Sequence, residues 1–426
     1  MRSLLLMTAV LLFGAALTGC SILPPNTPEE PTGPSHGYTG VTCSFTTVTE
    51  DPCRCPVAYR LYWGDGQVSD WSDFVSSGTP VTMLHAWDSA GVYQVSSQAR
   101  NVLGLMSGIS PAHGLVISDR TGYPDTVVAT IPVGGDPHGI TCLPDGRFVY
   151  VGNETVNLVF VVNTATNMVV DSVVCGQSPW SVASSPDGQY VYAVNLRSAD
   201  VSVIRTSDNA VVATTAVGQS PHGIAPLPNG QYVYVANIDV NSVSVIRTSD
   251  FTVVATVPVG VQPRGICCLP DGSLVYTANA DGPSVSVIRT SDNTVIATIP
   301  VPGYPHRITA SADGQYVYAV QANLNSVAVI RVADNTVVGS IPVGSGPCGS
   351  CWLPGGSYVY VTNPGSSSVT VIRTTDNTVV ATIPVGSGAR AIAADGAGQR
   401  LYTADRSSRT VSVIGFRELA GDQAAH

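Results

Sequence analysis

The chain has 426 residues and a formal net charge of −10 at pH 7, and charged residues make up 11% of it against 44% for hydrophobic ones. Its 19 basic residues are all arginine, which excludes chemistry that needs a lysine amine, such as a Schiff base or a Walker phosphate loop. An acidic chain with few, scattered arginines is also poorly suited to nucleic acid, because phosphate contacts dominate that affinity, so no nucleic-acid partner is expected. The length and the 42 glycines and 30 prolines favour an all-β protein with more than one domain.

Residues 1–19 have the pattern of an export signal. The apolar stretch, residues 4–17, is shorter than the ~20 residues that span a bilayer as a helix. Leu17-Thr18-Gly19-Cys20 resembles the bacterial lipobox, which implies cleavage before Cys20 and attachment of a diacylglycerol to its sulfur. Ser21 after the cysteine implies sorting to the outer membrane in Gram-negative bacteria. We therefore expect an exported protein, lipid-anchored to the cell envelope at the outer membrane or cell surface; the alternative is an ordinary secretory signal.

The next segment, residues 20–36, is rich in proline and is predicted to be an extended tether. Residues 37–118 are expected to form a small immunoglobulin-like β-sandwich, because short alternating apolar segments are separated by turn residues.

Several motifs in this region resemble the PKD family, namely Tyr62-Trp63-Gly64-Asp65-Gly66, His85-Ala86-Trp87, Gly91-Val92-Tyr93-Gln94-Val95 and the later Asn101. Trp87 stands where the family has tyrosine. The resemblance implies a non-catalytic spacer or adhesion module on an extracellular protein. We interpret His85 and Asp65 as hydrogen-bonding groups of the turn and core, and not as an acid/base pair.

Three cysteines in the predicted sandwich are disulfide candidates: Cys43, Cys53 and Cys55. Export would place them in an oxidising compartment, where a bridge persists. A bridge from Cys43 to Cys53 or to Cys55 is expected, and the sequence does not choose between the two.

Residues 119–416 contain seven copies of one sequence unit, with a period of 42 residues. Each copy has four period-2 segments separated by turns such as Pro144-Asp145-Gly146, and no helical pattern. A four-stranded unit of this length repeated seven times predicts a seven-bladed β-propeller. The chain enters at residues 126–133 with an outer strand and leaves at residues 410–414 with a third strand, so the first strand is expected to complete the last blade. Residues 417–426 are a C-terminal tail.

The copies resemble the YVTN family of propeller repeats, as seen in Tyr360-Val361-Thr362-Asn363, Tyr234-Val235-Ala236-Asn237 and Tyr276-Thr277-Ala278-Asn279. The resemblance implies a seven-bladed propeller typical of surface-layer and secreted proteins of bacteria and archaea. It does not imply one activity, because propellers host enzymes, binders and scaffolds alike.

Two sets of polar residues are predicted to form concentric rings at one mouth of the central channel. The first set begins the inner strand of each copy: His138, Trp180, His222, Arg264, His306, Cys348 and Arg390. The second set ends the second strand: Asn153, Asn195, Asn237, Asn279, Gln321, Asn363 and Asp405. We interpret the asparagines as caps of the loops that follow them. The varied first ring, with Asp405, is the candidate site for a ligand or partner, although packing between blades is an equally weighted alternative for it.

No metal site is assigned, because histidines separated by an intervening blade are expected to lie too far apart to share one ion. The CxxC of Cys348 and Cys351 is expected to open a strand that holds the two sulfurs beyond disulfide reach, so it is interpreted as structural. The recurring Arg-x-x-Asp pairs, such as Arg205 and Asp208, are interpreted as surface turns.

The favoured function is a lipid-anchored scaffold or binding protein that presents its propeller to an envelope protein or glycan. The sequence contains no Ser-His-acid order, paired-carboxylate spacing or haem-attachment CxxCH, so no catalytic residue and no cofactor is assigned. The alternatives are a propeller enzyme of lactonase-like or quinoprotein-like type acting at the channel mouth, or a structural surface-layer subunit.

Overall fold

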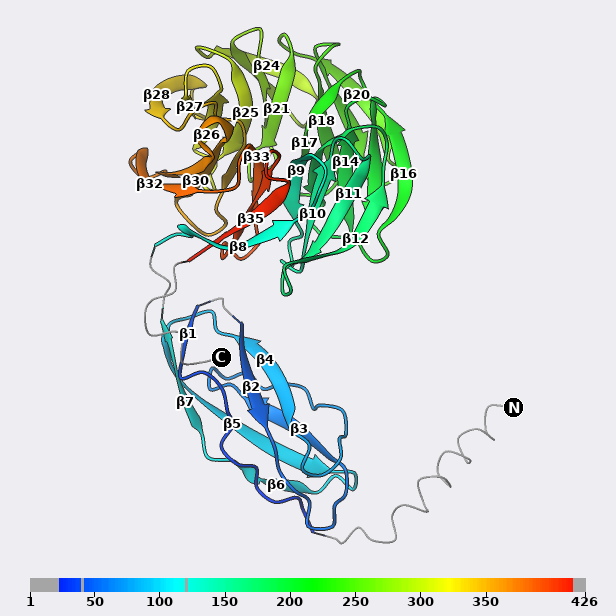
Figure 1. Ribbon diagram of the computed structural model, residues 1–426, viewed down its shortest axis with the longest axis vertical. Coiled ribbons are helices and arrows are strands. Elements are labelled where there is room, and N and C mark those ends of the chain that lie inside the picture. The colour runs from blue at the N-terminus through cyan, green and yellow to red at the C-terminus, as the bar shows by residue number, and fades with distance from the viewer. Residues whose placement is uncertain (1–22, 40–41, 119–121, 417–426) are drawn as a thin grey trace, which may run out of the picture. The chain divides into compact units, whose positions relative to one another are not determined.

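The computed structural model describes residues 23–39, 42–118 and 122–416, and the predicted signal and Cys20 lie outside them. The chain divides into two compact units between Gly122 and Tyr123. The fold is all-β, as predicted: a small β-sandwich precedes a ring of seven four-stranded sheets (Figure 1). Among the described residues, no helix has the length and apolar character needed to span a bilayer.

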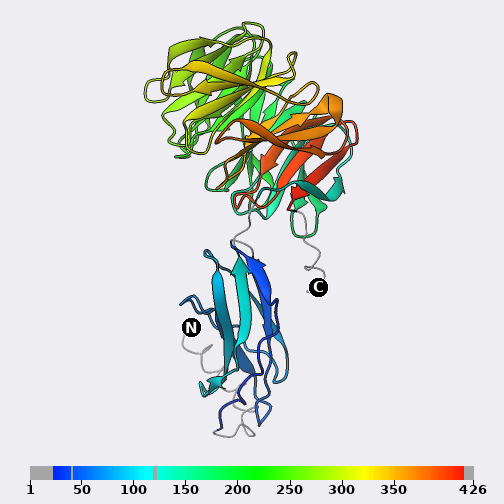
Figure 2. The ribbon, with the colours of Figure 1, turned by 90° about the vertical axis from the view of Figure 1, so that its left-hand side faces the viewer.

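The sandwich has a five-stranded and a two-stranded sheet, with its long strands side by side in Figure 2. The larger sheet contains β1 (His36–Tyr38), β7 (His113–Ser118), β5 (Gly91–Asn101), β3 (Val57–Tyr62) and β6 (Met106–Ile109). The smaller pairs β2 (Thr42–Thr47) with β4 (Val81–Ala86).

The core of the sandwich is aromatic. Phe45, Trp63 and Trp87 are buried and meet edge to face, with ring centroids 6.0–6.2 Å apart. The His85 ring stacks on Trp63 at 4.7 Å and its Nε2 lies 2.7 Å from a carboxylate oxygen of Asp65. Both residues therefore join the turn to the core, as expected.

The proline-rich segment, predicted to be an extended tether, is extended in its described part and packs on the sandwich. Pro25, Pro28 and Pro31 are buried while the residues between them are exposed. This three-residue period is that of a polyproline II helix with one face against the domain. Backbone hydrogen bonds from Asn26 to Glu50 and between Thr32 and Thr46 hold the segment in place.

Cys55 forms a disulfide bond, but its partner is not Cys43, in contrast to the predicted bridge. Cys43 is present as a thiol in the core, and burial raises its pKa. Cys43 lies at the start of β2, whereas Cys53 and Cys55 follow the loop after the end of that strand.

Each propeller blade is an antiparallel sheet of four strands that run from the channel outward. In that order, the blades are: blade 1, β9 (Pro137–Cys142), β10 (Phe148–Asn153), β11 (Leu158–Asn163), β12 (Met168–Val174); blade 2, β13 (Pro179–Ser184), β14 (Tyr190–Asn195), β15 (Asp200–Arg205), β16 (Ala210–Ala216); blade 3, β17 (Pro221–Pro226), β18 (Tyr232–Asn237), β19 (Ser242–Arg247), β20 (Thr252–Pro258); blade 4, β21 (Pro263–Cys268), β22 (Leu274–Asn279), β23 (Ser284–Arg289), β24 (Thr294–Pro300); blade 5, β25 (Pro305–Ala310), β26 (Tyr316–Gln321), β27 (Ser326–Arg331), β28 (Thr336–Pro342); blade 6, β29 (Ser350–Trp352), β30 (Tyr358–Asn363), β31 (Ser368–Arg373), β32 (Thr378–Pro384); blade 7, β33 (Ala389–Ala394), β34 (Leu401–Asp405), β35 (Thr410–Gly415), β8 (Thr126–Pro132). A short 3₁₀ helix, η1 (Pro364–Ser366), follows β30.

The predicted closure of the ring is confirmed. β8 pairs antiparallel with β35, and Ile131 lies opposite Val411. Ile131 is buried in a cluster with Val411 and Val413, so the first strand of the propeller fills the outer position of the last blade. This pairing joins the two ends of the ring by a sheet ladder.

Neighbouring blades are joined by a repeated contact between a buried tyrosine and a turn asparagine of the next blade. Tyr234 Oη donates to Asn293 Oδ1 at 2.6 Å, and equivalent bonds join Tyr150, Tyr276 and Tyr318 to their asparagines. Asn293 has φ +56°, a left-handed conformation that asparagine tolerates better than most residues. The turn asparagine therefore serves both the hairpin and the interface between blades.

Candidate binding site at the channel mouth

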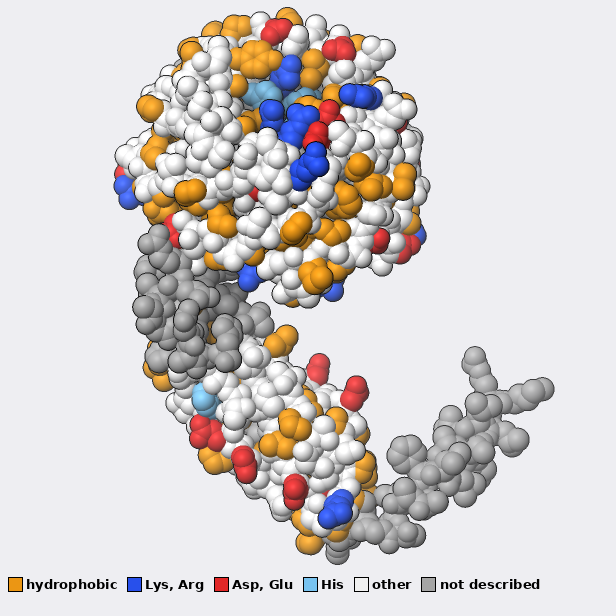
Figure 3. All heavy atoms as spheres, in the orientation of Figure 1, with side chains coloured by type: hydrophobic (Ala, Val, Ile, Leu, Met, Phe, Trp, Pro, Cys, Tyr) orange, Lys and Arg blue, Asp and Glu red, His pale blue; other side chains and the backbone are white. Residues whose placement is uncertain are grey.

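The inner strands approach one another closely, and glycine makes this approach possible. A Cβ at Gly223 would lie 2.3 Å from the backbone oxygen of Arg264, and one at Gly139 would lie 2.6 Å from that of Trp180. Side chains that begin the inner strands therefore converge on a narrow channel. We call the seven predicted residues His138, Trp180, His222, Arg264, His306, Cys348 and Arg390 the channel-mouth ring. Figure 3 shows arginine and histidine side chains gathered at the hollowed centre of one propeller face.

Four of these side chains form a chain of ring contacts. The centroids of His138 and Trp180 lie 3.6 Å apart, those of Trp180 and His222 5.3 Å, and those of His222 and His306 5.5 Å. The last contact joins rings from blades 3 and 5, although histidines separated by an intervening blade are predicted to lie too far apart to share one metal ion. It forms because the Arg264 side chain of the intervening blade lies over the ring of Tyr304.

Each of the ring histidines His138 and His222 also contacts the backbone of the next blade. Their Nδ1 atoms lie 3.2 Å from the carbonyl oxygens of Trp180 and Arg264. Because a carbonyl only accepts, Nδ1 carries the proton and Nε2 of the neutral ring is an acceptor. Burial, together with the charge of Arg307, lowers the pKa of both histidines well below the usual value. Both rings are therefore neutral at pH 7.

Sequence reasoning missed Arg307, which is central to the site. The equivalent position in the other copies is small: Gly139, Ser181, Gly223, Gly265, Gly349 and Ala391. The Arg307 guanidinium donates from Nη2 to Ser181 Oγ at 3.0 Å, from blade 5 to blade 2. A cavity of about 150 Å³ lies between the inner strands and is lined by Arg307, Ser181, Gly139 and Gly349 among others. The signal that could have revealed it is a break in residue size at one position of the repeat.

Several nitrogen atoms of the ring are buried and lack a protein partner. Trp180 Nε1, Arg264 Nε, Arg390 Nε and His222 Nε2 have no hydrogen-bond partner among the described residues. The first three are N–H donors, and leaving such a group unsatisfied costs about 1–3 kcal/mol. The fourth, in the neutral ring, is an acceptor. The mouth therefore offers converging donors and an acceptor without protein groups to occupy them.

Cys348 is the acidic group of the ring. Burial alone would raise the pKa of its thiol, but His306, whose Nδ1 lies 3.7 Å from Sγ, and the charges of Arg307 and Arg390 lower that pKa to about 6. Cys348 precedes β29 and does not open it, in contrast to the expectation, because its backbone N–H and that of Gly349 are bonded to Thr362. Cys351 is a separate free thiol, and burial raises its pKa.

Asp405 does not belong to the site, which corrects its assignment there. The side chain is fully buried and accepts hydrogen bonds from Thr403 and Ser412. Asn237 at the same position is also fully buried and donates to Ser242 and Ser244, whereas Asn153 bonds Gly134 and Asp136 in the loop before its inner strand. Most of this second set therefore holds the hairpin between strands two and three of its own blade.

Asp136 and Glu154, which lie close to residues of the two predicted rings in the sequence, both form an ion pair with Arg406. Arg406 Nη2 lies 3.1 Å from Glu154 and 3.5 Å from Asp136. No carboxylate is among the groups that shift the pKa values of His138, His222, Arg307 or Cys348. Within the described ranges, no cluster of three His, Cys, Asp or Glu side chains has the geometry of a metal site.

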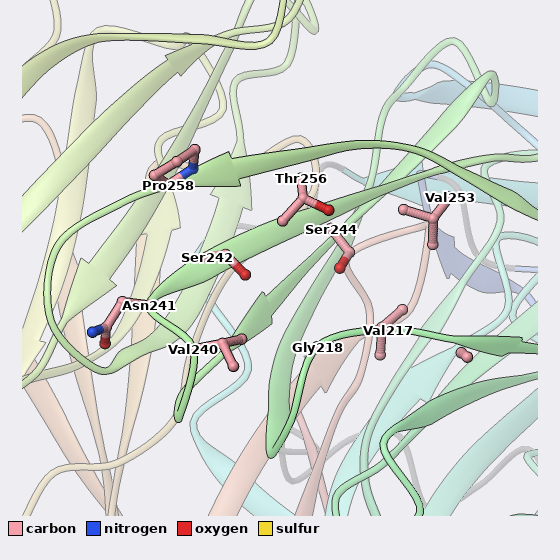
Figure 4. Close-up of a pocket in the computed structure, with 10 residues that line it drawn as sticks. Val217, Gly218, Val240, Asn241, Ser242, Ser244, Val253, Thr256 and Pro258 are labelled. Carbon is pink, nitrogen blue, oxygen red and sulfur yellow. The ribbon is translucent and has the colours of Figure 1, made fainter.

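A larger pocket at the outer side of the ring is a feature of the repeat. Figure 4 shows it between the end of β16 and strands β19 and β20, lined by Val217, Gly218, Ser244 and Thr256 among others. The equivalent groove between blades 5 and 6 has Val343, Gly344, Thr370 and Thr382 in the same places. Because the groove recurs with the same kind of lining, we attribute it to blade packing.

Comparison with known proteins supports the fold. The YNCE-like beta-propeller family model matches residues 88–231. Among solved structures, the chain is similar to one titled Kuenenia stuttgartiensis Hydrazine Synthase, with a TM-score of 0.60 and 23% identity over 70% of this chain and 99% of that chain. At this identity the likeness shows the propeller fold alone. No curated protein sequence matches the chain.

Proposed function

We propose that this protein is a binding protein of the cell envelope, lipid-anchored through Cys20, whose propeller takes a polar ligand at the channel mouth. The ligand is an envelope protein or glycan group. The observation that carries the proposal is the set of unpartnered donors on Trp180, Arg264 and Arg390. A ring that served packing alone would be expected to satisfy these groups within the protein.

Binding is favoured over catalysis by the composition of the mouth. Sites of lactonase-like or quinoprotein-like type usually need clustered carboxylates, a metal or a bound cofactor. In the described part of the chain, the one acidic residue predicted for the mouth, Asp405, is buried inside its blade. The guanidinium of Arg307, which lines the cavity, would also repel a metal ion.

A structural role as a laterally assembling subunit is the second candidate. The outer strands carry exposed valine and isoleucine side chains, for example Val128, Val254 and Ile296 at 41–48% exposure. Repeated apolar side chains on the perimeter favour side-by-side contact. Each outer strand also has a bulge where it pairs with the third strand, as between Val203 and Ile204, and bulges discourage pairing of sheet edges.

The test compares three forms of the protein on one envelope extract. The triple variant Trp180→His, Arg264→His and Arg390→His places in blades 2, 4 and 7 the residue that blades 1, 3 and 5 use, so it should fold. Arg205→Gln removes an exposed arginine far from the channel and is the control.

The proteins and glycans retained by each form are quantified by mass spectrometry. A component held by the parent and the control but lost by the triple variant supports the proposal. Retention of the same components by all three forms contradicts it. A concentration-dependent increase in mass during analytical ultracentrifugation, with nothing retained through the ring, would favour the structural candidate.

A further inference from the structure

The Arg307 guanidinium at the channel mouth has no carboxylate partner among the described residues. Arg307 lines the cavity, and Arg264 and Arg390 lie close enough to influence the pKa values of its neighbours, while His138 and His222 are neutral and Cys348 supplies one negative charge as a thiolate. The only hydrogen bond of the Arg307 guanidinium among the described residues is to the Ser181 hydroxyl. Burying a guanidinium without a carboxylate is costly, and burial accordingly lowers the pKa of Arg307.

The position of Arg307 shows that this charge is a departure from the repeat. Copies of the unit place glycine, serine or alanine at this point, and the blade needs nothing larger. One arginine in place of a small residue brings a guanidinium into a cavity of about 150 Å³. A water molecule occupies about 30 Å³ of liquid, so this space takes a small charged group with a few waters.

The guanidinium donors of the channel mouth are of the kind that recognises oxyanions. Guanidinium groups match the oxygen atoms of a carboxylate or phosphate in geometry and in charge. Arg264 is held over the Tyr304 ring at 5.4 Å, which restricts its orientation. Its Nε, that of Arg390 and the Trp180 Nε1 are buried and unpartnered in the described structure.

We propose that the channel mouth binds an oxyanion, a carboxylate or phosphate group, between Arg307, Arg264 and Arg390. The inference rests on the proposed function and names the chemistry of its ligand. The unpartnered acceptor Nε2 of His222 takes a hydroxyl of the ligand or a bound water. The oxyanion is either a free small molecule or the same group on a larger envelope component.

The test measures binding of inorganic phosphate, succinate and a hexaglutamate peptide by titration calorimetry at constant ionic strength, with chloride as the reference anion. Arg307→Gly restores the residue found in four other copies and removes the central charge. Arg205→Gln removes an exposed charge and is the matched control. Thermal melting checks that each variant is folded, and Arg390→His is the second variant if Arg307→Gly does not fold.

We expect at least one of the three probes to bind the parent and the control, with affinity at least tenfold lower in Arg307→Gly. Binding of phosphate or succinate identifies a free anion as sufficient, whereas binding of hexaglutamate alone identifies a tethered carboxylate. Equal affinity in the parent and Arg307→Gly overturns the inference, as does the absence of binding of every probe to the parent. If every probe fails while ring-dependent retention from the envelope extract persists, the proposed function stands and only its anionic ligand is wrong.

Discussion

The guanidinium of Arg307 in blade 5 donates to the hydroxyl of Ser181 in blade 2, 3.0 Å away. These residues occupy the same position of the repeat, 126 residues apart. Small residues at that position let the inner strands pack closely, and the serine and the arginine meet inside the channel that results. The contact places a guanidinium where the other copies of the repeat have a small residue. Removing that guanidinium should therefore change the free energy of unfolding.

Arg307→Gly should stabilise the ligand-free propeller by about 1 kcal/mol, because an unpaired guanidinium leaves a poorly solvated site. The free energy of unfolding is measured by denaturant titration in chloride buffer. Destabilisation by more than about 1 kcal/mol would instead show that the bond to Ser181 holds the ring together and that Arg307 is a structural residue.

Cys348 should react faster near neutral pH than Cys142, a propeller thiol that is buried to a similar degree. The pKa of about 6 makes Cys348 a thiolate at pH 7, whereas burial raises the pKa values of Cys142 and Cys175 to about 12. Alkylation by iodoacetamide, followed residue by residue with mass spectrometry, should show a rate that rises through about pH 6.

The same measurement on His306→Asn tests the cause of the shift. Removing the imidazole leaves burial opposed only by the charges of Arg307 and Arg390, so the pKa of Cys348 should rise and the rate profile should move to higher pH. The folded-state pKa is depressed, so the stabilisation it contributes is present above the unfolded value near 9 and is lost as the pH falls through about 6. A profile that does not move in the variant would refute this role of His306.

Ring closure should depend on the buried face of β8. Ile131→Ala removes a fully buried side chain from the cluster with Val411 and should lower the free energy of unfolding by about 2–4 kcal/mol. Val128→Ala, on the same strand but 48% exposed, should change it by less than about 0.5 kcal/mol. Equal effects of the two substitutions would mean that β8 contributes little to closure.

Each hydrogen bond between a blade tyrosine and the turn asparagine of the next blade should make a measurable contribution to the free energy of unfolding. Tyr234→Phe removes the hydrogen bond to Asn293 and should cost about 1 kcal/mol. Tyr192→Phe is the control, because the corresponding turn position holds Phe251, whose side chain cannot accept such a bond. Chemical denaturation of the two variants compares them, and an equally large loss for Tyr192→Phe would mean that the effect comes from packing.

Much of the fold follows from periodic features of the sequence. Strand order, blade number and the closure by β8 depend on local patterns that repeat every 42 residues, and each copy supports the others. The sandwich core could be anticipated from its Trp63 and Trp87 motifs. The packing of the proline-rich segment was not predicted, because composition alone predicts an extended segment and does not show what one face of it packs against. That face carries Pro25, Pro28 and Pro31.

The site was less predictable, because it depends on distances between side chains of different blades. The convergence of the ring follows from the repeat, but the contact between His222 and His306 depends on where the Arg264 side chain turns. Asp405 was predicted to bind a ligand because it carries a charge where most other copies have asparagine. Its carboxylate instead accepts hydrogen bonds from the hydroxyl groups of Thr403 and Ser412 on its own blade. Arg307 differs from its counterparts in size, a signal that comparison of polar residues alone overlooks.

The most direct test of the account is a high-resolution structure of the protein purified from its native envelope. We expect density for a bound group between Arg264, Arg307 and Arg390, within hydrogen-bonding distance of the unpartnered Nε atoms of Arg264 and Arg390. A channel mouth that contains only water, with a ligand bound elsewhere on the propeller or on the sandwich, would contradict it.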